Sequence, residues 1–386
     1  MEKPAAQRLA ALDTLRGIAV LLVLARHMPL PEGLSPWLDV PLRALQRGGW
    51  AGVDLFFVLS GFLVSGLLFR EWSRHGELRA GRFLIRRCFK IYPAFYAMLA
   101  VVMIWSVSQG RWPGWGYVGS EALFIQNYGP AVFPHTWSLA VEEHFYLTLP
   151  LLLLLLRSGK ERPFAALPAV FVGVAVACLA LRVAGAWGQS MAVRGSFAPT
   201  HLRIDSLLFG VLLAWLTHFR GEPLRRFVIR WRWWMLASAF TLAAPAFVFE
   251  LAPTWHLFTF GFTALYLAGG LLLLVAVHHP ARRGALAWIG FYSYSIYLWH
   301  IAVERIFLPR LLPLEVDPFV QLAAYFFASI AAGVLAAWMV ELPFLRLRDR
   351  WFPSKFQPIR LERTPPLDAA APVPTTRGHV ARHRLL

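Results

Sequence analysis

Ten runs of apolar residues, each close to the length of a membrane span, occupy most of this 386-residue chain. A helix needs about 20 apolar residues to cross the hydrocarbon of a bilayer. Because no water is available there to hydrogen-bond the backbone, such runs fold as helices. We therefore predict an all-α, polytopic membrane domain over residues 1–345. The runs lie at about 9–29, 51–69, 91–108, 136–156, 164–183, 200–219, 233–249, 256–278, 285–307 and 319–341. A further run, 121–126, is too short to cross.

Segments rich and poor in Lys and Arg alternate between these runs. The rich segments hold seven such residues in 70–90, three in 157–163, five in 220–232, two in 282–283 and nine after 341, whereas no intervening segment holds more than two. The positive-inside rule then places both termini in the cytoplasm. Topology thus accounts for the formal charge of +17, and we do not expect nucleic acid as a partner. The basic, Pro- and Ala-rich residues 346–386 are expected to be a disordered cytoplasmic tail.

The first apolar run carries ionisable residues, among them Asp13, Arg16 and His27. Arg16 and His27 are eleven residues apart, which places them on nearly the same helix face, about 16 Å apart along the axis. A charge inside a membrane helix costs several kcal/mol unless it is partnered or lines a cavity. The run has no small-residue cleavage site, so we expect it to remain as a span. These residues predict a site that works across the bilayer through one cavity.

Five of the expected helices place polar residues near the predicted outer face. A single histidine at a helix end is usually interfacial, but convergence of five helices indicates a functional site. Residues Ser293, Tyr297, His300 and Glu304 form one stripe on the ninth run, because they step by four, three and four positions. The other four helices contribute His27, Asp54, Ser138 with Glu142, and Arg203 with Asp205.

An imidazole at this depth is suited to proton transfer. A neutral histidine can take a proton from a hydroxyl, and a carboxylate behind it can orient the ring. We therefore predict His27 as a catalytic group, paired with Glu142 or with Asp54. No HExxH or CxxC motif is present, and we predict no metal site.

A cluster of cations lies toward the predicted cytoplasmic side. Arg86, Arg87 and Lys90 belong to the sequence RFLIRRCFKIYP, and Arg16 lies at a similar depth. Two interpretations stay open. The sequence is either an ordinary basic loop that sets topology or an anion clamp for a phosphorylated substrate, since guanidinium groups match phosphate oxygens.

At these residues the chain resembles acyltransferase family 3, a group of integral membrane proteins that O-acylate cell-surface glycans. Arg16 and His27 lie in LDTLRGIAVLLVLARH, which has the family's R-x10-H spacing, and Ser138 and Glu142 lie in HTWSLAVEEHFYLTLP, which has its S-L-x-x-E pattern. The remaining similar segments, in family order, are GGWAGVDLFFVLSGFLVS with Asp54, RIDSLLFG with Arg203 and Asp205, YSYSIYLWH with Tyr294 and His300, and ELPF with Glu341.

The resemblance implies an enzyme of the cytoplasmic (inner) membrane. Its donor substrate would be acetyl-CoA or another acyl-CoA entering from the cytoplasm, with no permanently bound cofactor. Its acceptor would be a hydroxyl of a cell-surface or lipid-linked saccharide. His27 would be catalytic, Glu142 its acidic partner, and Arg16, Arg86, Arg87 and Lys90 would face the donor. Ser138, Arg203, Asp205, Tyr294, Tyr297 and His300 would support the acceptor side.

Two features differ from the family pattern. The family's R-x-x-R element appears here as Arg87-Cys88-Phe89-Lys90, and lysine lacks the guanidinium fork that grips a phosphate in two places. Some relatives also carry an extracytoplasmic hydrolase-like domain, which we do not expect here. Acceptor handling would then rest with the membrane domain or with a periplasmic or glycan-assembly partner protein.

Three alternatives stay open at this point. His27 acts either as a general base or as a transient covalent carrier of the acyl group. A multi-pass transporter or flippase of a lipid-linked sugar would use intramembrane charges equally well. A membrane scaffold without chemistry would leave the convergent polar residues unexplained.

Overall fold

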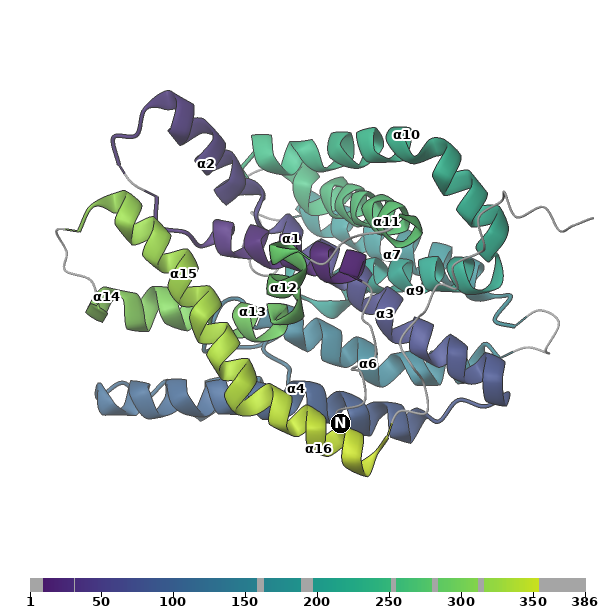
Figure 1. Cartoon of the computed structure of the whole chain (residues 1–386), viewed down its shortest axis with the longest axis horizontal. Helices are drawn as coiled ribbons and strands as arrows, with labels where there is room; N and C mark the ends of the chain where they lie inside the picture. The colour runs from purple at the N-terminus through teal and green to yellow at the C-terminus, as the bar shows by residue number, and fades with distance from the viewer. Residues whose placement is uncertain are drawn as a thin grey trace, which may run out of the picture.

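The computed structural model describes residues 10–30, 32–157, 163–188, 197–250, 255–279, 284–311 and 316–353, and the regular structure in these residues is entirely helical. The all-α prediction is therefore confirmed for this part of the chain. The longest helices lie along the long axis of the molecule (Figure 1). In chain order the elements are α1 (Ala10–Arg26), α2 (Pro36–Gly48), α3 (Ala51–His75), α4 (Ala80–Ser108), α5 (Trp115–Ala122), α6 (Trp137–Leu155), α7 (Leu167–Gly188), η1 (Thr200–Leu202), α9 (Ile204–Phe219), α10 (Gly221–Val248), η2 (Leu257–Gly261), α11 (Phe262–His278), α12 (Ala285–Phe291), α13 (Ser293–Ala302), η3 (Val303–Phe307), α14 (Leu308–Leu311), α15 (Pro318–Ala336), η4 (Ala337–Glu341) and α16 (Leu342–Trp351).

Six helical segments among the described residues are long and apolar enough to cross a membrane. They are α3, α4, α6, α7, η2 with α11, and α15 through α16. Four of the ten expected spans differ. The first and sixth form the shorter helices α1 and α9, the seventh lies within the arginine-rich α10, and the ninth is divided among α12, α13 and η3. The multi-pass helical architecture is thus supported, while the count of ten and the side of the termini remain predictions.

The basic segment 70–90 is mostly helix rather than loop. Helix α3 continues to His75 and ends at Gly76, whose φ of +67° is the left-handed conformation that favours glycine. Helix α4 begins at Ala80, so Arg86, Arg87 and Lys90 lie on a helix in fixed directions. Lys and Arg are good helix formers, so a basic segment need not interrupt a helix. The final helix likewise extends to Trp351, beyond the domain boundary expected at 345, and the tail from 354 lies outside the described residues.

The short apolar run 121–126 does not form a spanning helix. The eight-residue helix α5 ends at Ala122 and is followed by turns. The buried carboxylate of Glu121 then accepts hydrogen bonds from the backbone N–H of Val132 (3.0 Å) and the hydroxyl of Thr136 (2.8 Å). These bonds fix the segment that leads into α6.

Glycines bring several helices into close contact. Gly61 of α3 faces the backbone of Leu207, and Gly210 of α9 faces the backbone of Val58, so each helix has a glycine where the other helix crosses it. Gly17 of α1 and Gly290 of α12 form a similar pair. Small residues at such crossings let membrane helices pack backbone to backbone. Figure 1 shows α12 beside α1 near the centre of the molecule.

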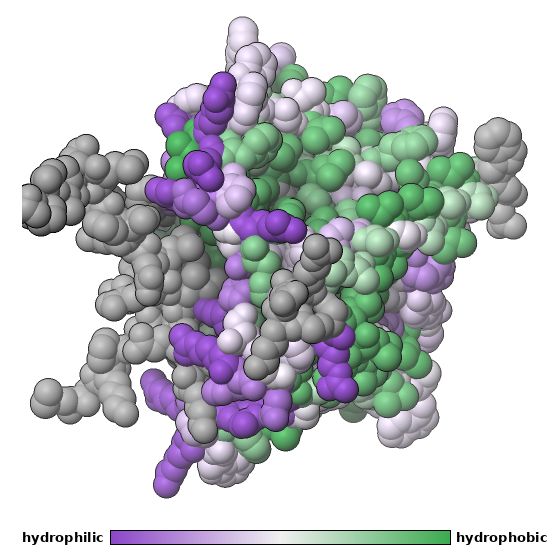
Figure 2. All heavy atoms as spheres, turned by 90° about the vertical axis from the view of Figure 1, so that its right-hand side faces the viewer, coloured by the Kyte–Doolittle hydropathy of each residue, from purple (hydrophilic) through white to green (hydrophobic). Residues whose placement is uncertain are grey.

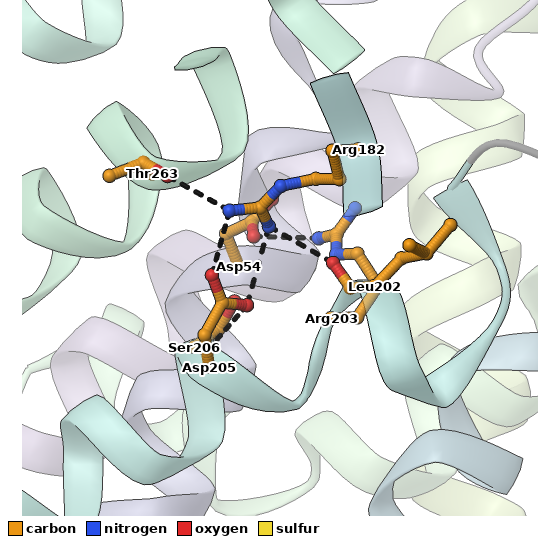
Figure 3. A network of polar contacts seen from close by, with 7 residues as sticks. All are labelled: Asp54, Arg182, Leu202, Arg203, Asp205, Ser206 and Thr263. Atoms are coloured by element: carbon orange, nitrogen blue, oxygen red, sulfur yellow. Dashed lines mark hydrogen bonds and ion pairs between the residues drawn. The ribbon is translucent and has the colours of Figure 1, made fainter. Parts of the chain in front are cut away.

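A buried network of four charged residues joins α3, α7, α9 and α11 (Figure 3). Arg203 donates to Oδ1 of Asp54 at 2.6 Å, and Arg182 donates to Oδ2 of Asp205 at 2.8 Å and to Thr263 Oγ1 at 2.9 Å. The side chains of all four charged residues are at most 1% exposed. The Arg203 guanidinium also lies 3.7 Å from the centre of the Phe262 ring. Two cations and two anions thus neutralise one another in the core.

The surface separates by polarity. Figure 2, which looks onto the right-hand side of Figure 1, shows hydrophilic side chains gathered in one region beside a broad hydrophobic one. The exposed side chains include large apolar ones, such as Leu155 (83%) and Phe240 (69%). A membrane protein presents such a surface to lipid.

We expect Gly61→Ala to lower the thermal unfolding temperature, because the added methyl group would meet the backbone of Leu207. Gly66→Ala on the same helix is the matched control, since no atom lies within 4 Å of its added methyl group. Alanine there should be neutral or stabilise by up to about 1 kcal/mol. Tryptophan fluorescence during heating in detergent measures both effects. Equal behaviour of the two variants would contradict the close α3–α9 crossing.

We expect Arg203→Met to cost about 3–5 kcal/mol, because it leaves the Asp54 carboxylate buried without its partner. The double variant Asp54→Leu/Arg203→Met should recover much of this loss in denaturant unfolding. The exposed pair Arg43–Asp39, at 2.7 Å, provides the control, and Arg43→Met should cost only about 0.3–0.5 kcal/mol. A single Arg203 variant as stable as the wild type would disprove the structural role of the network.

Candidate active site

Three histidines from separate parts of the chain meet at one end of the helical bundle. His27 follows α1, His135 precedes α6, and His300 lies on α13. The ring centre of His300 lies 5.2 Å from that of His27 and 4.9 Å from that of His135. His300 is fully buried, His135 is 4% exposed, and His27 is half-buried. We call these three residues the histidine cluster.

The sequence predicted two members of this cluster and missed the third. His27 and His300 were predicted, but His135 was not. A signal for it was present, because His135 lies three residues before Ser138 and its S-L-x-x-E pattern. A histidine that directly precedes a helix lies at the same end of the bundle as the first turn of that helix, and here the first turn contains the candidate residue Ser138.

Tyr297 connects the cluster with the interior of the bundle. Its ring packs against His135 and His300, with ring centres 5.5 and 5.6 Å away. Its hydroxyl donates to the backbone carbonyl of His135 at 2.8 Å and lies 2.5 Å from the hydroxyl of Ser138. Tyr297 and Ser138 were both predicted as supporting residues, and the structure places them in contact.

A cavity lies on the other side of Tyr297. Its volume is about 100 Å³, well below the roughly 300–1,000 Å³ typical of small-molecule pockets. Five helices supply its polar lining, which contains seven of the predicted residues: Arg16, Arg87, Lys90, Ser138, Glu142, Tyr294 and Tyr297, together with Ser60, Glu143, Tyr146 and Ser293. His27 and His300 are not among its lining residues. The single cavity from the basic residues to His27 that we expected is therefore interrupted at Tyr297 and Ser138.

Glu142 faces this cavity and not His27. Its Oε1 accepts a hydrogen bond from Ser60 at 3.0 Å, and its Oε2 accepts one from Tyr146 at 2.7 Å. Asp54 is also held away from His27, because it pairs with Arg203 in the buried charge network. The expected pairing of His27 with Glu142 or Asp54 is therefore not found, since both carboxylates bond to other partners. The ring that lies against His27 is that of His300.

Two cations line the cavity without a polar partner in the described part of the chain. Arg16 and Arg87 form no hydrogen bond or ion pair with any described residue, although the Arg87 guanidinium lies 5.4 Å from the ring centre of Tyr146. Electrostatic attraction reaches both arginines from Glu142. Their guanidinium groups thus remain able to bind an anion.

The other two predicted donor-side cations are engaged with protein groups. Lys90 pairs with the carboxylate of Glu341, which also accepts a hydrogen bond from Ser295 at 2.7 Å. Arg86 contacts the carbonyl of Phe352 and lies 3.1 Å from the carboxylate of Asp349. These two residues connect α4 with η4 and α16. Sequence alone could not distinguish them from Arg16 and Arg87, because it does not show which cations have protein partners.

Tyr294, Arg203 and Asp205 have structural contacts as well. The Tyr294 hydroxyl donates to the carbonyl of Ile91 at 2.9 Å and so holds α13 against α4. Arg203 and Asp205 lie in the buried charge network with Asp54. Arg182, which we did not predict as a site residue, completes that network. An arginine within the apolar run 164–183 was the available signal.

Comparison with known proteins shows the family of this chain. A family model described as an acyltransferase domain matches residues 9–338. The chain is 29% identical over 337 residues to the peptidoglycan O-acetyltransferase OatA of Listeria monocytogenes, covering 78% of this chain and 50% of that protein. It is 28% identical to a putative O-acetyltransferase of Staphylococcus aureus, covering 76% and 50%, and 26% identical to the putative peptidoglycan O-acetyltransferase YrhL of Bacillus subtilis, covering 76% and 48%.

The chain thus spans about half the length of these curated relatives. No solved structure matches it. The family model, however, covers all the residues that line the cavity and form the histidine cluster. On this ground the chain belongs to the acyltransferase family 3 of integral membrane proteins.

Proposed function

We propose that this protein is a transmembrane O-acyltransferase that moves an acetyl group, or another short acyl group, from cytoplasmic acyl-CoA to a hydroxyl of a cell-surface glycan. The observation that carries the proposal is one cavity closed by Tyr297 against the histidine cluster, with two arginines in its lining that pair with no described residue. The predicted topology puts the arginines toward the cytoplasm and the histidines toward the outer face.

The two arginines of the cavity are suited to binding an anionic acyl donor. Coenzyme A carries phosphate groups, and the guanidinium groups of Arg16 and Arg87 are free to bind them. A cavity of about 100 Å³ does not hold a nucleotide, so the nucleotide would stay at the basic end. Only the thin arm that carries the thioester would enter between the helices. Glu142, held by Ser60 and Tyr146, would keep the two arginines in place by its opposite charge.

The histidine cluster suits transfer to an alcohol. In direct transfer, the acceptor oxygen attacks the thioester carbonyl carbon and the carbon–sulfur bond breaks. The hydroxyl proton passes through His27 to the departing thiolate, so the products are an ester and CoA. In the covalent alternative His27 first carries the acyl group, and both routes need its ring. Because the cavity ends at Tyr297 and Ser138, the acyl group meets His27 only when their hydrogen bond opens.

The names of the relatives suggest the acceptor. Two of them are named as peptidoglycan O-acetyltransferases, one of these as putative. We therefore propose a cell-wall or lipid-linked saccharide as the acceptor and the cytoplasmic membrane as the location. A periplasmic or glycan-assembly partner would present the saccharide if the membrane domain does not bind it alone.

The central experiment supplies radiolabelled acetyl-CoA to membranes that contain the full chain and follows label into glycan. We expect transfer by the wild type and by His256→Ala, which removes an exposed histidine, and none above background by His27→Ala. Transfer by His27→Ala at the wild-type rate would rule out both the direct and the covalent route through His27. Movement of a lipid-linked sugar without labelled product would support the transporter instead.

The donor side is tested by Arg16→Gln and Arg87→Gln. Each change removes a charged hydrogen-bond donor worth about 1.5–3 kcal/mol, so the KM for acyl-CoA should rise about tenfold or more. The matched control is Arg225→Gln on α10, whose side chain is 42% exposed and lies 3.6 Å from Glu222. Its KM should not change. An unchanged KM in both cavity variants would show that these arginines do not bind the acyl donor, and would favour a role in setting membrane topology.

A further inference from the structure

Two ring nitrogens of the histidine cluster are buried without a hydrogen-bond partner among the described residues. They are Nδ1 of His135 and Nε2 of His300. The two side chains are 4% and 0% exposed, so bulk water does not satisfy these atoms. A buried polar atom without a partner costs free energy and calls for an explanation.

The other nitrogen of each ring fixes its protonation. Nδ1 of His300 lies 2.5 Å from the carbonyl oxygen of Tyr297, and Nε2 of His135 lies 3.3 Å from that of Leu298. Carbonyl oxygens only accept hydrogen bonds, so these two nitrogens carry the hydrogens. In a neutral imidazole the remaining nitrogen is then a bare acceptor. Both unpartnered atoms therefore require a donor.

For Nε2 of His300, the neighbouring group able to supply that donor is His27. Its ring centre lies 5.2 Å from that of His300, with the ring planes at 54°, and its ring forms no hydrogen bond with a described residue. The other polar groups nearby are engaged: the Tyr297 hydroxyl with Ser138 and His135, Arg26 with the carbonyl of Gln46, and Arg305 with Glu304. At this ring separation a small rotation allows one imidazole N–H to reach the nitrogen of the other.

We propose that His300 is a positioning residue that acts through His27. Its bare Nε2 accepts a hydrogen bond from one ring nitrogen of His27, which leaves the other nitrogen of His27 unprotonated and turned toward the acceptor hydroxyl. A histidine thus takes the place that a carboxylate holds behind the histidine of a catalytic triad. Glu142 and Asp54 are not available for that place, because Ser60, Tyr146 and Arg203 occupy them. This inference rests on the proposed function for its chemistry, but the state of the His27 ring is measurable without it.

The test compares His300→Phe, which removes the acceptor but keeps an aromatic ring, with His300→Gln, which restores an acceptor oxygen. In acetyl transfer, His300→Phe should lower kcat about 100-fold while KM for acyl-CoA stays constant, and His300→Gln should recover part of the loss. His278→Phe is the control. It removes a histidine that makes the same kind of Nδ1–carbonyl bond, at 2.8 Å to Leu274, away from the cluster, and kcat should stay unchanged.

A second measurement does not depend on catalysis. In the full chain labelled with 15N-histidine, the ring shifts of His27 should show one neutral tautomer in the wild type and in His300→Gln, and a mixture in His300→Phe. A wild-type mixture, or one unchanged tautomer in all three proteins, would overturn the role of His300. Equal kcat in the wild type and His300→Phe would overturn it too. Absence of transfer by the wild type, together with the expected shifts, would reject the acyltransferase while keeping the His27–His300 pair.

Discussion

The cost of placing a charge in hydrocarbon governs this structure more than any other interaction. A deeply buried charge is costly unless it pairs with an opposite charge or lines a cavity. The Asp54–Arg203 and Asp205–Arg182 pairs satisfy the first condition, with side chains at most 1% exposed. Arg16 and Arg87 satisfy the second. The same rule therefore divides the charges of one bundle into those that hold helices together and those that line the cavity.

The helical fold followed from the sequence because apolar length alone requires helices in a bilayer. Elements whose form depends on packing were less predictable. Helix α13 begins at Ser293, directly after Tyr292, where the expected ninth span divides, and nothing in its apolar pattern marks that point. The basic stretch before Ile91 was expected as a loop and is largely helix. Charge patterns report which side of a membrane a segment faces and not whether its backbone is helical.

The candidate site was predictable in many of its members but not in its pairings. Sequence placed His27, Ser138, Tyr297 and His300 at one depth, because helix rise fixes depth. It also suggested a carboxylate beside His27, but rotation about the helix axis turns Glu142 toward Ser60 and Tyr146. The depth of a residue in the membrane follows from counting positions along its helix, whereas the direction of its side chain depends on how the helices pack. For this reason His135, which lies outside a helix, escaped detection.

The contact between Tyr297 and Ser138 has a consequence for selectivity against water. A thioester is an activated compound, and water is the most abundant alcohol-like nucleophile it can meet. If the two hydroxyls stay bonded until an acceptor arrives, the acyl donor waits in a compartment that the outer solution does not enter. A closed passage of this kind would also keep ions from crossing the bilayer through the protein. Wasteful hydrolysis and ion leakage would then be prevented by the same pair of side chains.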